Sequence, residues 1–265
     1  MADAAVVLAP EPRAARPNPV VSGDTRYGRM LFLSTDLFIG ASLQQYGEYS
    51  ELELQHLRPY VPEGGVVLDV GANVGALTLA FARWVGQAGA VFAFEPQPFI
   101  YYLLCGNVAW NGLFQVNCQR VALAHDVGVT MIHDVDYTER QNFGGFQCHS
   151  QDGQIPTNIS MIDAFRLNRC DLIKVDVEGM EKMVLRGGYQ TIRRFRPILW
   201  VECERDEQTA RHIELIKWIH AHLDYDCELI ATPLFNPGNW KGDAVVGDFA
   251  HVFTHNLLCR PRSPR

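Results

Sequence analysis

One segment of the chain constrains the fold most. Over residues 66–95 an apolar run, a glycine-bearing turn, a helical stretch and a second apolar run follow one another. The first run, residues 66–70, is apolar at four of its five positions, which is typical of a strand buried on both faces of a sheet. The turn carries Gly71 and Gly75, and the second run ends at Glu95. Strands that alternate with helices in this way predict an α/β protein with a mostly parallel sheet and helices on both faces.

The same alternation continues along the rest of the chain. Strands are predicted over residues 27–38 (a strand or hairpin), 66–70, 90–94, 115–123, 127–133, 172–177, 198–203, 227–231 and 249–259. Helices are predicted over residues 50–60, 76–85, 99–111, 180–194 and 206–223. Ser50 and Glu53 have the spacing of a capping box, so the first of these helices is expected to begin at Ser50. Residues 138–154 are expected to form a long functional loop.

The length and composition indicate one globular domain behind a tail. The chain has 265 residues, of which 48% are hydrophobic, and this length suits a single large α/β domain. Residues 1–24 are rich in Ala, Pro and Arg and are expected to form a mobile tail. Residues 25–265 are expected to form the domain, with 27–60 as an N-terminal strand and helix cover and 66–261 as a Rossmann-like core.

The charge balance and the cysteines indicate which partners and which cellular compartment to expect. The chain carries 23 basic and 30 acidic residues, a net charge of -7, so nucleic acid and anionic membranes are not expected as partners. No apolar stretch is long enough to span a bilayer, and the N-terminus does not resemble a secretory signal. The cysteines number seven and include no CxxC pair, which favours a reducing compartment. The sequence therefore predicts a cytoplasmic protein.

The glycine turn indicates a nucleoside-containing cofactor. A side chain at Gly71 or Gly75 is expected to block the approach of a ligand to the helix N-terminus. Glu95 lies 20 residues after Gly75, where a carboxylate can accept both hydroxyls of a ribose. A dinucleotide fold requires a glycine where this chain has Asn73, because the pyrophosphate must approach the backbone there. S-adenosylmethionine has no pyrophosphate, so the turn favours it over NAD, and an NAD-dependent oxidoreductase remains the alternative.

Charged residues in two later strands point to catalysis. Lys174 and Asp176 share one face of a predicted strand, where burial is costly unless the charges are paired or used. Asp176 and Glu178 lie at the carboxyl edge of the sheet, where open α/β sheets bind ligands. The structural alternative is a Lys174–Asp176 ion pair with Asp176 or Glu178 capping the next helix.

Glu202 brings a further carboxylate to the same edge. Asp176 is predicted to be the base or the group that orients the acceptor, Glu202 is the second candidate, and Lys174 is expected to keep Asp176 ionised. Asp176 and Glu202 could instead hold a divalent metal ion, which is possible but not favoured.

Taken together, these motifs resemble the FkbM-type family of S-adenosylmethionine-dependent methyltransferases. The resemblance extends over residues 27–261, and DVEGxE is its most specific part. It rests on YGEY (46–49), VVLDVGANVGALTL (66–79), FAFEP (92–96), Asn107, Asn111-Gly112, SMID (160–163), LIKVDVEGMEKMVLRGG (172–188), RPILWVECE (196–204) and NLL (256–258). It implies a Rossmann-like class I methyltransferase fold, in which the mostly parallel seven-stranded sheet has a reversed last strand. It also implies methyl transfer, often to a hydroxyl of a sugar or natural product, so the expected partner is a small-molecule or glycoside acceptor.

The motifs and the resemblance together predict roles for individual residues. The cofactor-binding residues are expected to be Asp69, Gly71, Ala72, Asn73, Gly75, Glu95, Pro96, Val121 and Ala122. The catalytic residues are expected to be Lys174, Asp176, Glu178 and Glu202. The acceptor is expected to contact Glu48, Asn142 and His251. A methyltransferase-like module that binds ligands without catalysis is the remaining alternative.

Overall fold

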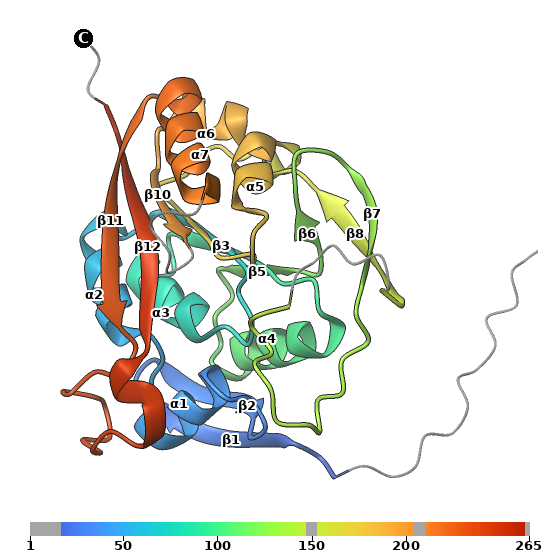
Figure 1. Ribbon diagram of the computed structural model, residues 1–265, viewed down its shortest axis with the longest axis vertical. Helices are drawn as coiled ribbons and strands as arrows, with labels where there is room; N and C mark the ends of the chain where they lie inside the picture. The colour runs from blue at the N-terminus through green and yellow to red at the C-terminus, as the bar shows by residue number, and fades with distance from the viewer. Residues whose placement is uncertain (1–16, 147–152, 204–209, 263–265) are drawn as a thin grey trace, which may run out of the picture.

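A computed structural model describes residues 17–146, 153–203 and 210–262 of the protein (Figure 1). Its central element is a seven-stranded sheet in the order β11-β12-β10-β9-β3-β4-β5. The strands are β3 (Val66–Val70), β4 (Ala90–Phe94), β5 (Val116–Gln119), β9 (Leu172–Val175), β10 (Ile198–Glu202), β11 (Tyr225–Pro233) and β12 (Phe253–Pro261). β12 is antiparallel to both of its neighbours, β10 and β11, whereas β10, β9, β3, β4 and β5 are parallel to one another. The predicted α/β fold with a reversed last strand is confirmed.

Seven α-helices in the described ranges cover the sheet. They are α1 (Ile39–Tyr46), α2 (Glu51–Leu57), α3 (Ala76–Val85), α4 (Pro98–Trp110), α5 (Glu181–Gly187), α6 (Tyr189–Phe195) and α7 (Ala210–Trp218). Shorter helical turns are η1 (Arg58–Tyr60), η2 (Ile162–Phe165), η3 (Ile219–Leu223) and η4 (Gly247–His251). None of the helices in the described ranges combines the length and apolar character that crossing a bilayer requires.

The core has two layers because successive strand residues point to opposite faces. On one face α1 to α4 pack against strand residues such as Val67, Leu172 and Trp200. On the other face α5, α6 and α7 (orange in Figure 1) pack against residues such as Leu68 and Val201. All positions of β3 and β9 are buried, as expected for central parallel strands.

Two small sheets complete the fold. A hairpin of β1 (Val20–Thr25) and β2 (Gly28–Leu33) lies against α4, where the buried Asn107 accepts a hydrogen bond from Leu31 N (2.6 Å) and donates to Leu31 O (2.9 Å). A second sheet in the order β6-β8-β7 contains β6 (Ala122–Leu123), β8 (Ile155–Ser160) and β7 (Gly128–Ile132).

Several predicted element boundaries were wrong. Residues 20–24, assigned to the tail, form most of β1, while residues 1–16 lie outside the described ranges. The single strand predicted over 115–123 is two strands, β5 and β6, which belong to different sheets. The helix predicted over 180–194 is two helices, because it is interrupted at the Gly187-Gly188 pair.

The end of the chain differs in detail from the prediction. The helix predicted over 206–223 is α7 followed by the π-helical turn η3, and residues 206–209 lie outside the described ranges. The strand predicted to begin at residue 249 begins at Phe253, after η4. β8 was not predicted. Of the long loop predicted over 138–154, residues 147–152 are outside the described part of the chain.

The capping box predicted at Ser50 is absent. Ser50 precedes α2 with a φ of 50°, and its side chain forms no capping hydrogen bond. The Glu53 side chain is buried instead, where it accepts a hydrogen bond from the Trp200 indole N–H at 2.7 Å. The Glu53 side chain therefore packs against β10, whereas the local sequence pattern predicted that it caps the helix.

Candidate active site

A cavity of about 170 Å³ lies at the carboxyl edge of the four central strands. The segments that follow β3, β4 and β9 and the last residue of β10 form its floor. They contribute Gly71, Ala72, Asn73, Glu95, Pro96, Gln97, Asp176, Val177, Glu178 and Glu202, together with Lys174 from β9 itself. Residues from the α1–α2 segment, from the loop over 142–146 and from β12 form the walls. Strand order thus brings together the predicted motifs that are far apart in the sequence.

The glycine turn after β3 owes its glycines to packing within the protein. Gly71 has a φ of 81°, and a Cβ there would lie 1.8 Å from the Asp176 carbonyl oxygen. Gly75 has a φ of 91°, and a Cβ there would lie 2.7 Å from Leu104 Cδ1. Packing within the protein therefore accounts for both glycines, because they let β3 approach the β9 end and α3 approach α4. Gly71 also lines the cavity, and its contact with a cofactor stays a prediction.

Glu95 is held rigidly at the end of β4. Its two carboxylate oxygens accept hydrogen bonds from Asn73 N (3.0 Å) and Gln97 N (2.9 Å). Burial raises the pKa of Glu95 to about 7, in spite of these two bonds and the nearby Lys174 charge. Each carboxylate oxygen has two acceptor lone pairs, so Glu95 can still accept hydrogen bonds from ligand hydroxyls that enter the cavity.

The Lys174 ammonium lies next to two carboxylates at the floor of the cavity. Its ammonium donates to Gly71 O (2.9 Å) and lies 3.2 Å from Asp176 Oδ2 and 3.5 Å from Asp69 Oδ1. Burial acts to lower the pKa of Lys174, but the Asp176, Asp69 and Glu53 carboxylates outweigh burial and raise it. Asp69 is fully buried, accepts a hydrogen bond from Thr78 Oγ1 (2.6 Å) and does not line the cavity. The cofactor-binding role expected of Asp69 is therefore corrected to a structural one.

Asp176 and Glu202 form a carboxyl pair that shares a proton. The Asp176 side chain is 40% exposed, and this exposure faces the cavity. Burial acts to raise the pKa of Asp176, but Lys174 and the hydrogen bonds from Glu202 and Lys174 hold it below its usual value. Burial and the Asp176 charge raise the pKa of Glu202 well above its usual value. Within the pair the negative charge is therefore favoured on Asp176 and the proton on Glu202.

Glu178 adds a third carboxylate to this pair. Carboxylate oxygens of Asp176, Glu178 and Glu202 all lie within 4.8 Å of one another, a spacing that a divalent cation could bridge. The proton on Glu202 already reduces the repulsion within the cluster, and we assign no metal ion to it. The alternative in which Asp176 or Glu178 caps the next helix is wrong, because the N-cap residue of α5 is Met180.

The remaining cofactor residues expected from the sequence lie on two sides of Gly71. Ala72, Asn73 and Pro96 line the main cavity. Val121 and Ala122 do not, but they border a smaller apolar cleft that Gly71, Pro96 and Val177 share with the main cavity. Gly75 lines neither.

Of the three residues expected to contact the acceptor, the structure places one at the cavity. Asn142 lines it and accepts a hydrogen bond from Gly144 N (3.1 Å). His251 is exposed in η4 and does not line the cavity, so its expected role is corrected.

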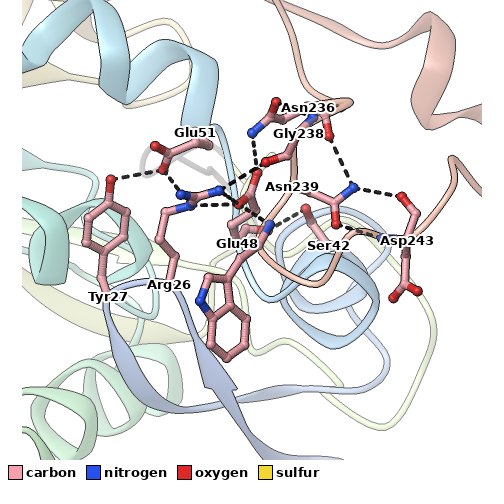
Figure 2. A network of polar contacts seen from close by, with 10 residues as sticks. Arg26, Tyr27, Ser42, Glu48, Glu51, Asn236, Gly238, Asn239 and Asp243 are labelled. Atoms are coloured by element: carbon pink, nitrogen blue, oxygen red, sulfur yellow. Dashed lines mark hydrogen bonds and ion pairs between the residues drawn. The ribbon is translucent and has the colours of Figure 1, made fainter.

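Glu48 also lies away from the cavity, in a buried polar network (Figure 2). Its carboxylate accepts hydrogen bonds from Arg26 Nε, Asn236 Nδ2 and Trp240 N, each at 2.8 Å. A buried carboxylate needs such partners, and these bonds tie the loop between β11 and η4 to the N-terminal segment. The acceptor-binding role expected of Glu48 is corrected to a structural one.

Five polar residues of the cavity wall were not predicted from the sequence. Three precede or belong to α2 and two belong to β12: Tyr49, Ser50, Glu53, Thr254 and Asn256. A signal for Glu53 was available, because it lies four residues before Leu57 and so shares the apolar face of α2. Asn256 gives a weaker signal as a polar residue that begins the apolar run Asn256-Leu257-Leu258.

The Glu53→Gln substitution is expected to flatten the pH dependence of stability. Burial raises the pKa of Glu53 from 4.5 to about 7, so the folded protein binds this proton more tightly than the unfolded chain does. The resulting stabilisation is fully present below about pH 4.5 and is lost as the pH rises through about 7. Between pH 4 and pH 8 the wild type should lose roughly 3 kcal/mol more of its unfolding free energy than the variant. Urea unfolding at both pH values measures the difference.

The exposed Glu63 provides the matched control for this measurement. Glu63→Gln should follow the wild-type pH profile. Equal losses of stability in wild type and Glu53→Gln would contradict the assignment of a raised pKa to Glu53. Glutamine can keep the hydrogen bond from Trp200, so the comparison isolates the charge.

The strand order and the site together define a class of protein. A parallel sheet with one reversed strand next to β10, a glycine turn after β3 and an acid after β4 are the features of the class I methyltransferase fold. Residues 69–227 match the family model described as "Methyltransferase FkbM domain". The chain belongs to this family, as the sequence motifs predicted.

Individual relatives agree with the family match. The chain is 25% identical over 148 residues to "Methyltransferase 1" of Beauveria bassiana, which covers 48% of this chain and 59% of that protein. It is 26% identical over 202 residues to "Methyltransferase sdnD" of Sordaria araneosa, which covers 60% of this chain and 78% of that protein. The solved structure of Trm5b from Pyrococcus abyssi shares the fold, with a TM-score of 0.50 and 13% identity over 93% of this chain and 56% of that one.

Proposed function

We propose that the protein is an S-adenosylmethionine-dependent methyltransferase that methylates a hydroxyl group of a sugar or natural-product acceptor. The observation that carries this proposal is the ionised Asp176, whose side chain is exposed into the cavity. Asp176 forms an ion pair with Lys174 and accepts a hydrogen bond from Glu202. Asp176 follows β9, between the turn after β3 on one side and Glu202 on the other. This position lies between the predicted cofactor residues and the remaining wall of the cavity.

The residues of the β3 and β4 ends fit the cofactor. The fixed Glu95 carboxylate retains lone pairs for the two ribose hydroxyls. The carboxyl groups of Glu53, Glu95, Asp176, Glu178 and Glu202 line the cavity, and this acidic lining suits the positive charge of a sulfonium and an α-ammonium group. When bound, S-adenosylmethionine supplies an electrophilic methyl group.

The protein's own groups prepare the acceptor oxygen. A hydroxyl is a poor nucleophile until its proton leaves, and Asp176 is the ionised group positioned to accept that proton. Lys174 keeps Asp176 ionised, and Glu202, which is protonated, donates a hydrogen bond that fixes the orientation of Asp176. The walls hold the acceptor oxygen in line with the methyl group, which is the main contribution that a protein makes to methyl transfer.

Incubation with radiolabelled S-adenosylmethionine and a panel of glycosides, polyketides and peptides tests the proposal. Transfer of label to a hydroxyl-bearing acceptor supports it. Binding of the cofactor with no transfer to any acceptor would favour the non-catalytic module instead. Transfer of label to an amine or a carbon would keep the methyltransferase activity but overturn O-methylation. The family match leaves no observation that favours the NAD-dependent alternative.

The Glu95→Gln substitution is expected to weaken cofactor binding by about 10–100-fold. It replaces one carboxylate oxygen, an acceptor of ribose hydroxyls, by an NH₂ group that cannot accept. Hydrogen bonds to the charged form of the carboxylate contribute about 1.5–3 kcal/mol. The glutamine NH₂ would also face the N–H of Asn73 or Gln97, which the carboxylate now satisfies. Isothermal calorimetry with S-adenosylmethionine measures the change.

The control is the exposed Glu139→Gln, which should leave the Kd unchanged. An unchanged Kd in Glu95→Gln would contradict the ribose-binding assignment.

A further inference from the structure

The cavity has a polar wall on the side away from Glu95. In the sheet order β12-β10-β9-β3-β4, Glu95 follows β4 at one end, and Asn256 lies on β12 at the other, directly opposite Glu202 of β10. Trp200 precedes Glu202 by two residues and therefore points to the same face, where it contacts Glu53 of α2. The α2 end and β12 thus meet over the half of the cavity that the cofactor residues do not occupy.

Two polar residues of this wall, Ser50 and Asn256, are buried at the cavity, and one of them has no hydrogen-bond partner. The Asn256 residue is 3% exposed and lines the cavity, so its side-chain amide can meet a ligand there. Ser50 also lines the cavity, and its hydroxyl is buried without a hydrogen-bond partner. Buried polar groups are nearly always hydrogen-bonded in folded proteins, so the unpartnered Ser50 hydroxyl in the cavity wall indicates a ligand that completes it.

Glu53 gives this wall a fixed carboxyl group. The Trp200 indole holds its Oε1 at 2.7 Å, and the carboxyl also interacts with Thr254 and with the Lys174 charge. The Ser50 hydroxyl, the Glu53 carboxyl and the Asn256 amide come from separate elements and all line one cavity. They combine one hydroxyl, one carboxyl and one amide, which together can donate to and accept from several hydroxyls of a ligand at once.

We propose that Ser50, Glu53 and Asn256 form an acceptor subsite that binds a polyhydroxylated, sugar-type acceptor through the hydroxyls next to the one that is methylated. This inference rests on the proposed function, because it assigns the acceptor's class and not the reaction. Asp176 and Glu202 lie between the subsite and the turn after β3, so the reacting hydroxyl sits at the carboxyl pair while its neighbours contact the subsite. A site built to hydrogen-bond a hydroxyl discriminates strongly against analogues that lack it, because its own buried groups are then left unpaired.

The test uses the full-length protein loaded with S-adenosylhomocysteine. The polyhydroxylated probes are methyl α-D-glucopyranoside, methyl α-D-mannopyranoside and methyl α-L-rhamnopyranoside, and the single-hydroxyl probe is cyclohexanol. Saturation-transfer NMR measures binding, and radiolabelled S-adenosylmethionine measures transfer. At least one glycoside should bind and accept label, whereas cyclohexanol should do neither.

Asn256→Ala should raise the KM for that glycoside by about 10–100-fold and leave the Kd of S-adenosylhomocysteine within twofold. The matched control is Asn158→Ala, an exposed asparagine on β8 that should change neither value. Ser50→Ala keeps the inference testable if Asn256→Ala does not fold. It should raise the same KM by at least fivefold while leaving Tm unchanged or higher, because it removes an unpartnered hydroxyl.

Three results would overturn the inference. Weaker binding of S-adenosylhomocysteine in Asn256→Ala, with the glycoside KM unchanged, would assign the wall to the cofactor. Binding of S-adenosylhomocysteine without binding of any glycoside would remove the sugar-type acceptor but leave the proposed methyltransferase in place. Failure of S-adenosylhomocysteine itself to bind would contradict the proposed function, and the inference would fail with it.

Discussion

Asp176→Asn is expected to lower kcat by about 10²–10⁴-fold, the contribution that a positioned general base makes. Asparagine has nearly the same shape as aspartate but cannot accept a proton at neutral pH. The hydrogen bonds that hold Glu95 come from Asn73 N and Gln97 N, and the substitution removes neither of them, so the Kd of S-adenosylmethionine should change by less than about threefold. Steady-state kinetics with a labelled methyl donor and calorimetry on the same preparation measure the two effects separately.

Glu202→Gln distinguishes the two members of the carboxyl pair. Because Glu202 already carries the proton, a neutral glutamine can still donate to Asp176, and kcat should fall by less than about tenfold. The exposed Asp126→Asn is the control and should behave as the wild type. A larger loss in Glu202→Gln than in Asp176→Asn would transfer the role of base to Glu202. Full turnover in Asp176→Asn would remove the catalytic assignment of Asp176.

The arrangement of the central sheet was predictable because it depends on patterns that are local in the sequence. A short apolar run buried on both faces, a turn and a helix recur along the chain, and each strand of such a unit ends at the same edge of the sheet. This rule alone brings Glu95, Asp176 and Glu202 together, and the structure places all three around one cavity. The Lys174–Asp176 pair was predictable for a similar reason, since period-two alternation puts both side chains on one face.

The N-terminal part of the site could not be predicted in the same way. Glu53 fitted a helix cap, but the free energy of burying it against Trp200 decides its position, and Trp200 lies 147 residues further along the chain. Glu48 carried a family motif, yet its partners Asn236 and Trp240 are near the other end of the sequence. Contacts between distant segments leave no periodic pattern in the sequence. The polar character of Glu48 and Glu53 was therefore predictable, but their partners were not.

The glycine turn shows a third kind of difference between sequence and structure. The motif was identified correctly, but the reason given for its glycines was the approach of a ligand. The structure adds a second reason, because a Cβ at Gly71 would lie 1.8 Å from the Asp176 carbonyl oxygen. Gly71, at the predicted cofactor site, therefore packs against Asp176, the residue predicted to act as base. A substitution at Gly71 is expected to have the largest effect on stability.

Gly71→Ala is expected to lower the free energy of unfolding by about 2–5 kcal/mol. The positive φ of Gly71 costs an alanine about 1–2 kcal/mol, and overpacking in a tightly packed region adds about 1–3 kcal/mol. The new Cβ would lie 1.8 Å from the Asp176 carbonyl oxygen, which is backbone and cannot rotate away. Urea unfolding monitored by tryptophan fluorescence measures the loss.

Gly64→Ala separates the two contributions. Gly64 has a φ of 69°, close to that of Gly71, but a Cβ there would have no heavy atom within 4 Å. This variant should therefore lose only about 1–2 kcal/mol and keep its activity. In Gly71→Ala the ends of β3 and β9 must separate, which displaces Asp176 from its position between Glu202 and the turn after β3, so kcat should fall together with stability. Equal destabilisation by the two substitutions, with activity retained in both, would show that the contact between Gly71 and Asp176 does not position the base.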